Sequence, residues 1–205
     1  MDAHAIREWI GRQVSDDEAK GFMAAMDAGL VRLSDDGLSI DLVGFPPFSK
    51  TKRYLLFGHW KSRAYWSWQE AFIQIAFAAE LVLLHEWPAS RVGIETGLDV
   101  AVLGTEDQPP VLLAEAKVDA RDLGYVMAVM RAVAADATAH AQPNPRGKDG
   151  NAVNKYAALS AHRPLYYVEV APDVRRVYRL TFVERDDTLR PAIEFEPADE
   201  VPAGP

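Results

Sequence analysis

Val111-Leu112-Leu113-Ala114-Glu115-Ala116-Lys117 is the stretch that decides the fold of this chain. An apolar run of this length predicts a β-strand, on which successive side chains point to opposite faces. Glu115 and Lys117 then share one face. Val111 and Leu113 lie behind them on that face, and the intervening residues point the other way. A carboxylate and an ammonium at the end of a buried strand are costly unless they pair with each other or bind a ligand.

Helices and further strands are predicted on both sides of this stretch. A helix is expected over residues 64–85 and ends before Pro88, and strands are expected over 91–96 and 98–103. Downstream, the pattern predicts a helix over 120–139, a Pro/Gly loop over 140–150, a helix over 151–161 and strands over 165–171, 175–184 and 192–196. This order predicts an α/β domain with a mixed β-sheet flanked by helices.

The first 45 residues read as a separate small unit. A helix is expected over 2–13, and a capping box at 15–18 predicts a second helix to about residue 28. Two alternating runs, 30–33 and 38–42, flank an Asp-Gly turn and predict a β-hairpin. This unit is similar to a truncated winged helix, or it is a small α+β cap on the main domain. Pro46-Pro47 marks the boundary, so we expect units at 1–45 and 46–196, followed by a frayed acidic tail at 197–205.

Carboxylates from two strands are expected to meet. Asp99 opens the strand that precedes the Glu115 strand, and if the two strands are neighbours their carboxylates converge at one sheet edge. Paired carboxylates favour a hard divalent cation such as Mg²⁺, which takes oxygen ligands. The backbone carbonyl of Ala116 is a candidate third ligand, and Lys117 would orient or deprotonate a water molecule there. The alternative is a structural salt bridge between Lys117 and Glu115 or Asp99.

Asp99 followed by Glu115-Ala116-Lys117 on the next strand, within this order of helices and strands, resembles the PD-(D/E)XK nuclease superfamily, which has the restriction-endonuclease-like fold. The resemblance covers residues 65–171. It implies that Asp99 and Glu115 bind Mg²⁺, with Mn²⁺ as a substitute, and that Lys117 assists the attacking water. Many members add a glutamate from the first helix, for which Glu70 is favoured and Glu80 is the rival.

The chain departs from the family pattern at two points. Leu98 stands where proline is common, and the helix after Lys117 lacks a Gln-x-x-x-Tyr signature, having only Tyr125. The tripeptide Glu18-Ala19-Lys20 repeats the Glu-x-Lys motif without a strand before it, and it is interpreted as a solvated helix face. What distinguishes the second copy is therefore its context of strands and helices.

Basic residues are concentrated in two segments of an acidic chain. The net charge is −8, yet residues 42–69 carry +5 with no acidic residue, and residues 137–168 carry +3. The first segment alternates aromatic and basic side chains, a pattern that stacks bases and binds phosphates. The expected nucleic-acid contacts are Lys61, Arg63, Trp66, Arg146, Lys148 and Lys155. The alternative is that these residues form ordinary solvated or core surfaces.

Composition excludes several other classes of protein. The chain has 205 residues and no cysteine, so disulfides, thiolate metal sites and cysteine nucleophiles are excluded. No apolar run approaches the roughly 20 residues that span a bilayer, and the first residues do not resemble a signal peptide, so a cytoplasmic location is expected. No phosphate-binding loop or dinucleotide motif is present.

The function expected from these features is Mg²⁺-dependent hydrolysis of nucleic acid by an endonuclease, with DNA favoured over RNA. One alternative is a non-catalytic nucleic-acid-binding or protein-interaction module on the same fold, acting in a larger complex. Another is a winged-helix-like regulator that binds DNA without cleaving it. Nucleases of this kind often dimerise, so a homodimer is an expected assembly.

Overall fold

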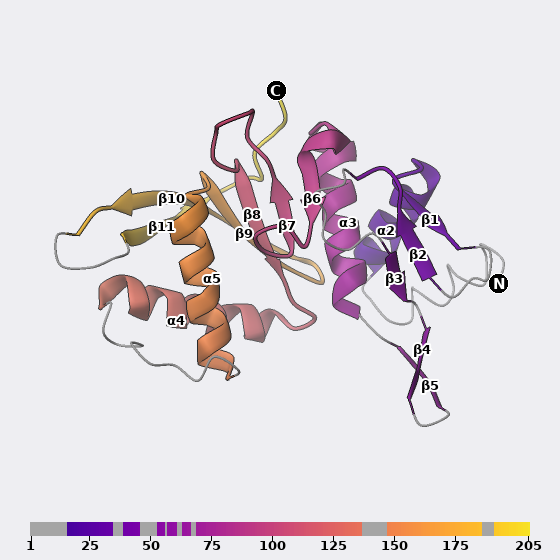
Figure 1. Cartoon of the computed structure of the whole chain (residues 1–205), viewed down its shortest axis with the longest axis horizontal. Helices are drawn as coiled ribbons and strands as arrows, with labels where there is room; N and C mark the ends of the chain where they lie inside the picture. The colour runs from indigo at the N-terminus through magenta and orange to yellow at the C-terminus, as the bar shows by residue number, and fades with distance from the viewer. Residues whose placement is uncertain are drawn as a thin grey trace.

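The computed structural model describes residues 16–34, 39–45, 53–55, 57–60, 63–66, 69–136, 147–185 and 191–205. Its centre is a six-stranded sheet in the order β11-β10-β9-β8-β7-β6 (Figure 1). The strands are β6 (Val92–Ile94), β7 (Val100–Val102), β8 (Leu112–Ala116), β9 (Tyr166–Ala171), β10 (Val174–Val183) and β11 (Ala192–Ala198). Strands β8 and β9 are parallel and the other neighbouring pairs are antiparallel. The predicted mixed sheet is therefore confirmed.

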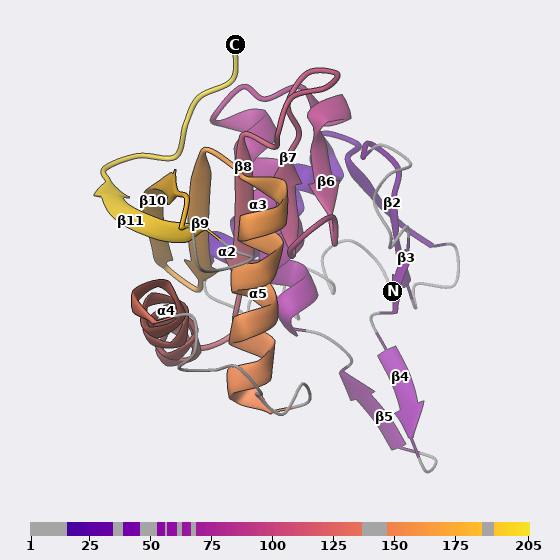
Figure 2. The same cartoon turned by 60° about the vertical axis from the view of Figure 1, so that its left-hand side comes forward.

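Helices cover both faces of this sheet. Helix α3 (Gln69–Leu83) packs on one face, and α4 (Ala120–Ala135) and α5 (Lys148–His162) lie on the other (Figures 1 and 2). The alternation of β8 fits these two layers: Leu112, Ala114 and Ala116 are buried in the α3 layer, and Leu113 is buried in the α4–α5 layer. Val111 differs from expectation, because it precedes the strand and packs with the α3 layer.

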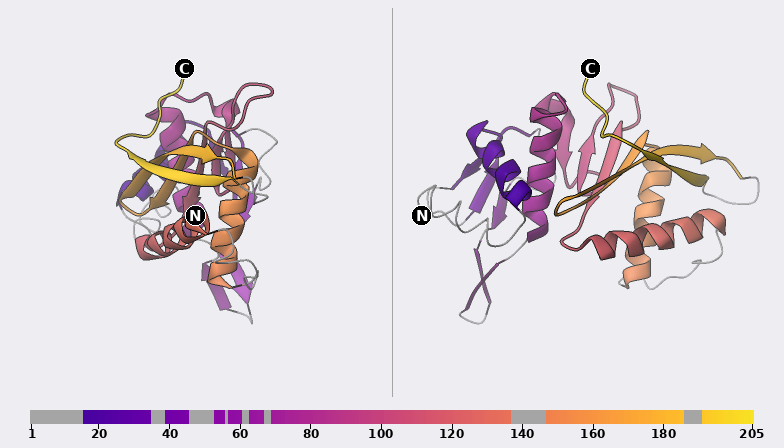
Figure 3. Two further views of the ribbon diagram at one scale, coloured as in Figure 1. Left: turned by 90° about the vertical axis from the view of Figure 1, so that its left-hand side faces the viewer. Right: turned by 180° about the vertical axis from the view of Figure 1, so that it is seen from behind.

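The N-terminal unit packs against the outer side of α3. Helix α2 (Asp16–Asp27) crosses α3, with the rings of Phe22 and Phe72 5.0 Å apart (Figure 3, right). A three-stranded antiparallel sheet follows, formed by β1 (Val31–Leu33), β2 (Ser39–Leu42) and β3 (Arg53–Leu55). Since β3 lies beyond the expected boundary at residue 45, the sheet of this unit extends further along the chain than predicted. The helix expected over 2–13 lies outside the described residues.

Three segments differ from the sequence expectations. The segment at 63–66 is strand β5 (Arg63–Trp66), which pairs with β4 (Phe57–Trp60) instead of opening α3. Helix α5 begins at Lys148, inside the segment expected to be a loop. The C-terminal tail, expected to be frayed, is held by two hydrogen bonds: Trp87 Nε1 donates to Pro202 O at 2.7 Å, and Gly204 N donates to His85 O at 2.6 Å.

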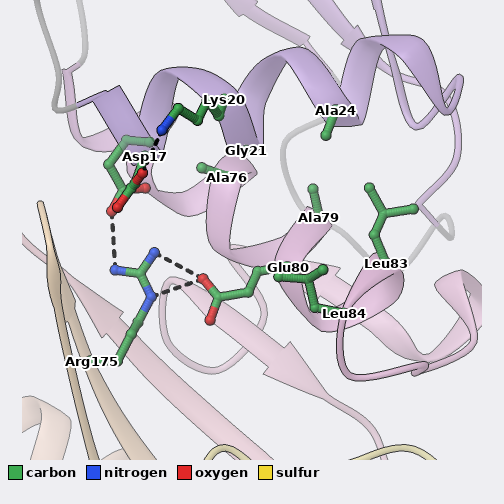
Figure 4. A pocket seen from close by; sticks show the side chains of 11 residues that line it. Asp17, Lys20, Gly21, Ala24, Ala76, Ala79, Glu80, Leu83, Leu84 and Arg175 are labelled. Atoms are coloured by element: carbon green, nitrogen blue, oxygen red, sulfur yellow. Dashed lines mark hydrogen bonds and ion pairs between the residues drawn. The ribbon is translucent and has the colours of Figure 1, made fainter.

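The first Glu-x-Lys tripeptide is not a solvated helix face. Glu18 is 1% exposed, and Arg175 of β10 donates to it at 3.0 Å while also bonding Glu80 of α3 at 2.9 Å (Figure 4). Only Lys20 of the tripeptide is exposed, where it pairs with Asp17. A cavity of about 390 Å³ lies beside this ion triad, between α2 and α3. Buried ions need partners, so the triad ties the N-terminal unit to the main sheet.

Candidate metal centre

Asp99 is held at the start of β7 by a tight turn. The chain turns between β6 and β7 through Glu95 and Gly97, both with left-handed backbone conformations at φ 53° and 77°. The backbone N–H of Asp99 then donates to Ala114 O at 3.1 Å, which sets Asp99 beside the end of β8. Its Oδ2 in turn accepts the N–H of Ala116 at 2.7 Å. The adjacency expected for the two strands is thus confirmed.

Glu115 and Lys117 lie at the end of β8 on the face toward α5. Glu115 is completely buried, and Lys117 Nζ lies 2.6 Å from Glu115 Oε1. This contact is an ion pair without the alignment of a hydrogen bond, so no donor in the described part of the chain hydrogen-bonds to Oε1. Lys117 Nζ donates instead to Glu70 Oε1 and to the carbonyl of Ala116, both at 2.6 Å. Its distance to Asp99 Oδ2 is 4.0 Å.

The third carboxylate comes from the first turn of α3. Glu70 lies in this cluster, where the positive end of the helix dipole favours an acidic side chain. Glu80, the rival position, lies three turns further along α3 and bonds Arg175 instead. Ligand atoms of Glu70, Asp99 and Glu115 lie within 4.8 Å of one another. Three elements that are distant in sequence therefore bring three carboxylates to one point.

A second lysine enters the cluster from α5. Lys155 Nζ donates to Glu115 Oε2 at 2.5 Å, and its side chain is only 12% exposed. Lys148, by contrast, is on the surface at the start of α5, 3.3 Å from Asp122 and over the ring of Tyr125. Lys155, expected to contact nucleic acid, thus lies beside the predicted catalytic glutamate.

Four other expected nucleic-acid contacts cannot be placed by their side chains. Lys61 and Arg146 lie outside the described residues. Arg63 and Trp66 belong to β5, but only the backbone of that strand is described. Their roles stay predictions.

The electrostatics of the cluster reflect crowding of negative charge. Burial first, and then the neighbouring Glu115 carboxylate, raise the pKa of Asp99 to about 7 against the opposing effect of Lys117 and Lys155. Burial lowers the pKa of Lys117, but Glu115 and Asp99 outweigh that effect, so the net direction is upward. Lys117 is therefore an ammonium at neutral pH, and Asp99 takes up a proton near neutral pH when no cation is bound.

The donor set fits a hard divalent cation. Three carboxylates supply oxygen ligands, which is the chemistry that Mg²⁺ and Mn²⁺ prefer. The carbonyl of Ala116, the expected third ligand, points to the same side as Lys117 Nζ. The Glu115 Oε1 atom is buried and accepts no hydrogen bond from the described residues, which makes it a candidate ligand atom. These features fit a metal better than they fit a neutral polar ligand.

Two buried polar residues behind the cluster were missed by sequence reasoning. Glu169 of β9 is in register with Glu115 of β8 and is completely buried. Tyr167, two residues earlier, is also buried, and its hydroxyl has no hydrogen-bond partner among the residues that the structure describes. Burial raises the pKa of Tyr167, and the Glu115 and Glu169 carboxylates raise it further. The signal was present, because Tyr and Glu alternate on one face of a strand that was interpreted as apolar.

Comparisons with known proteins neither identify nor exclude the expected family. Neither a protein-family model, nor a curated protein, nor a solved structure matches this chain significantly. Within the part of the chain that the structure describes, we find no helix with the length and hydrophobicity required to cross a bilayer. The function must therefore be argued from the geometry of the cluster.

Proposed function

We propose that this protein is a metal-dependent nuclease that hydrolyses phosphodiester bonds, a distant member of the PD-(D/E)XK superfamily. The observation that carries the proposal is the convergence of Glu70, Asp99 and Glu115 within 4.8 Å of one another, with Lys117 in contact with the group. Such a cluster is costly to bury, and a cation together with a phosphate would compensate its charge. The mixed sheet, with α3 on one face and α4 and α5 on the other, is consistent with this assignment.

Each residue has a distinct role in the proposal. Asp99 and Glu115 would hold Mg²⁺ or Mn²⁺, and Glu70 would complete the ligand set or position Lys117. The metal, when bound, lowers the pKa of water and neutralises charge on a phosphate. Lys117 would orient the attacking water, since its ammonium lies 2.6 Å from a carboxylate oxygen of both Glu70 and Glu115.

Lys155 supports a phosphate substrate in particular. Its ammonium has Glu115 as its partner, and a cation on Glu115 would weaken that pair by competing for the same carboxylate. Lys155 would then be available to contact a non-bridging oxygen of the scissile phosphate. Three carboxylates and two lysines have a net charge of −1, and a bound Mg²⁺ would change the net charge of the cluster to +1. That positive charge matches the single negative charge of a phosphodiester.

A non-catalytic module is the second candidate function. The observation that favours it is the pairing of Glu115, which has a lysine ammonium within 2.6 Å of each of its carboxylate oxygens. In this case the cluster would be a structural ion network, and nucleic acid would bind without cleavage. Dependence on Mg²⁺ separates the two candidates.

The deciding experiment is Mg²⁺ binding by calorimetry, combined with cleavage assays on plasmid and single-stranded DNA and on RNA. The wild type should bind Mg²⁺ and cleave, and Asp99→Ala should lose both. Asp107→Ala is the matched control, because Asp107 is an exposed aspartate in the turn between β7 and β8. This turn lies at the end of the two strands that is opposite Asp99 and Glu115. Absence of Mg²⁺ and Mn²⁺ binding by the wild type would make the cluster structural and favour the non-catalytic module.

A further inference from the structure

A cavity of about 380 Å³ opens directly beside the carboxylate cluster. Asp99 and Lys155, both members of the cluster, form part of its wall, and the β6–β7 turn at Glu95 and Gly97 forms another part. The remaining wall belongs to α5, including Asn154. Whatever fills this cavity therefore touches the proposed metal centre and the turn that positions Asp99.

One face of α5 is chemically suited to a ligand. Asn151, Asn154, Lys155 and Ala158 all line the cavity, and their spacing of three and four residues places them on one side of the helix. Each carboxamide carries two donor hydrogens and an acceptor oxygen. A hydrogen-bond donor beside an acceptor, as in a carboxamide, complements the donor and acceptor groups at the edge of a nucleobase.

We propose that this cavity holds the sugar and base of one unpaired nucleotide next to the scissile phosphate, an inference that rests on the proposed nuclease function. Asn151 and Asn154 contact the base edge, and Leu98 and Ala158 provide apolar surface for the base or sugar. The substrate class is thus a single strand, or a strand whose nucleotide at the cut is displaced from its duplex.

The charges of the cavity exclude a second phosphate. The carboxylate of Glu95 lines it, and Lys155, the lysine of its wall, is the group proposed above to contact the scissile phosphate. A second phosphate group in this position would face the like charge of Glu95 without a cation of its own, whereas a nucleoside is neutral. The volume of the cavity, about 380 Å³, lies near the lower end of the range of about 300–1,000 Å³ for small-molecule sites. A volume of this size suits one nucleoside and not a base pair.

The rest of the strand has a path on the other side of the cluster. A smaller cavity of about 140 Å³ is lined by Lys117, Tyr125 and Lys148. Asn151 lines both cavities, so they adjoin along α5. The two lysines of this second cavity outnumber its carboxylate, Asp122, which pairs with Lys148 at 3.3 Å, so the cavity suits the phosphate that follows the scissile one. The strand would therefore run along α5, with its displaced nucleoside beyond Asp99.

Cleavage mapping on single strands that contain one abasic position tests the proposal. For the wild type with Mg²⁺, an abasic nucleotide on one side of a bond should slow cleavage of that bond about 5- to 100-fold, the range expected for the loss of base contacts. An abasic nucleotide on the other side should have a small effect, and the matching duplex should be cut more slowly than the single strand. Asn154→Ala should abolish the difference between normal and abasic strands. Gln108→Ala, which removes an exposed carboxamide from the β7–β8 turn, is the matched control and should retain it.

A binding measurement keeps this test independent of catalysis. In the full-length protein with Ca²⁺, titration of a thymidine dinucleotide should shift the NMR signals of the Asn151 and Asn154 side-chain amides and leave that of Gln108 unchanged. Two results would overturn the nucleoside site while leaving the nuclease intact. One is equal cleavage rates for normal strands and for strands with an abasic position on either side of the bond. The other is side-chain amide signals of Asn151 and Asn154 that do not shift with the dinucleotide. Responsive amides in a protein that cleaves no strand would retain the nucleoside site and refute the nuclease.

Discussion

Replacement of Asp99 by asparagine should stabilise the metal-free protein at neutral and alkaline pH. Burial and the neighbouring Glu115 carboxylate raise the pKa of Asp99 from 3.8 to about 7. Its ionised form is therefore disfavoured in the folded state. Asparagine is neutral at every pH, and its side-chain oxygen can still accept the Ala116 N–H that Asp99 accepts at 2.7 Å. The variant thus removes the charge and keeps the hydrogen bond.

The magnitude follows from the pKa difference. Between pH 4 and 7 the folded protein retains a proton on Asp99 that the unfolded chain has released, so the folded state binds more protons and loses stability as the pH rises. A rise of about 3 in pKa, at about 1.36 kcal/mol per pH unit, corresponds to about 4 kcal/mol at most. We expect Asp99→Asn to match the wild type near pH 4 and to exceed its free energy of unfolding by up to this amount at pH 8.

Urea unfolding followed by tryptophan fluorescence at pH 4.5, 6 and 8, with EDTA present, measures this difference. Asp107→Asn is the matched control, because Asp107 is exposed in the β7–β8 turn and should leave the pH dependence of the wild type unchanged. Mg²⁺ should narrow this difference at pH 8: a concentration of 100 times the dissociation constant adds about 2.7 kcal/mol to the stability of the wild type and nothing to that of the asparagine variant.

Two results would refute this reasoning. If wild type and Asp99→Asn show the same pH dependence in EDTA, Asp99 is not a buried carboxyl beside Glu115. If Mg²⁺ raises the free energy of unfolding of both proteins equally, the ion binds at another site and Asp99 is not a ligand.

Three further predictions concern the site and its support. Glu115→Gln and Lys117→Ala should abolish cleavage with circular dichroism spectra like that of the wild type, and cleavage by either at the wild-type rate would contradict the site assignment. Lys155→Gln should slow cleavage while strengthening Mg²⁺ binding in calorimetry, because the lysine competes with the cation for Glu115; weaker Mg²⁺ binding would instead indicate that Lys155 only organises the ligands. Arg175→Ala should lower the free energy of unfolding by about 3–5 kcal/mol in urea titration, because it leaves Glu18 buried without its guanidinium, and Glu18→Gln in the same chain should restore part of the loss.

The central sheet was predictable because its strands carry strong local patterns. Strand β8 (Leu112–Ala116) is buried along its whole length, and its alternation places Glu115 toward α5 and Ala114 and Ala116 toward α3. The segment at 63–66 was mispredicted because its aromatic residues suit a helix start and a strand equally well. Pairing with β4 decides between them, and that pairing is a contact between segments.

The site was predictable only in part. Asp99 and Glu115 follow from two consecutive strands, whose adjacency is the commonest arrangement for neighbours in sequence. The preference for Glu70 over Glu80 could not follow from helical phase, because both lie on the buried side of α3. The contacts of the two ends of α3 distinguish these glutamates: Glu70, near its start, pairs with Lys117, and Glu80, near its end, pairs with Arg175.

The sequence by itself determined which side chains of β8 face each layer, which segments form the helices around the sheet, and that Asp99 and Glu115 lie at one end of neighbouring strands. These features depend on hydrophobic periodicity and on the pairing of strands that are consecutive in sequence. Tertiary structure alone decided that Lys155 reaches Glu115, that Glu169 lies in register beside it and that Glu18 is buried against Arg175. Each of these pairs joins elements far apart along the chain, and a charged residue carries no local signal of which distant partner will neutralise it.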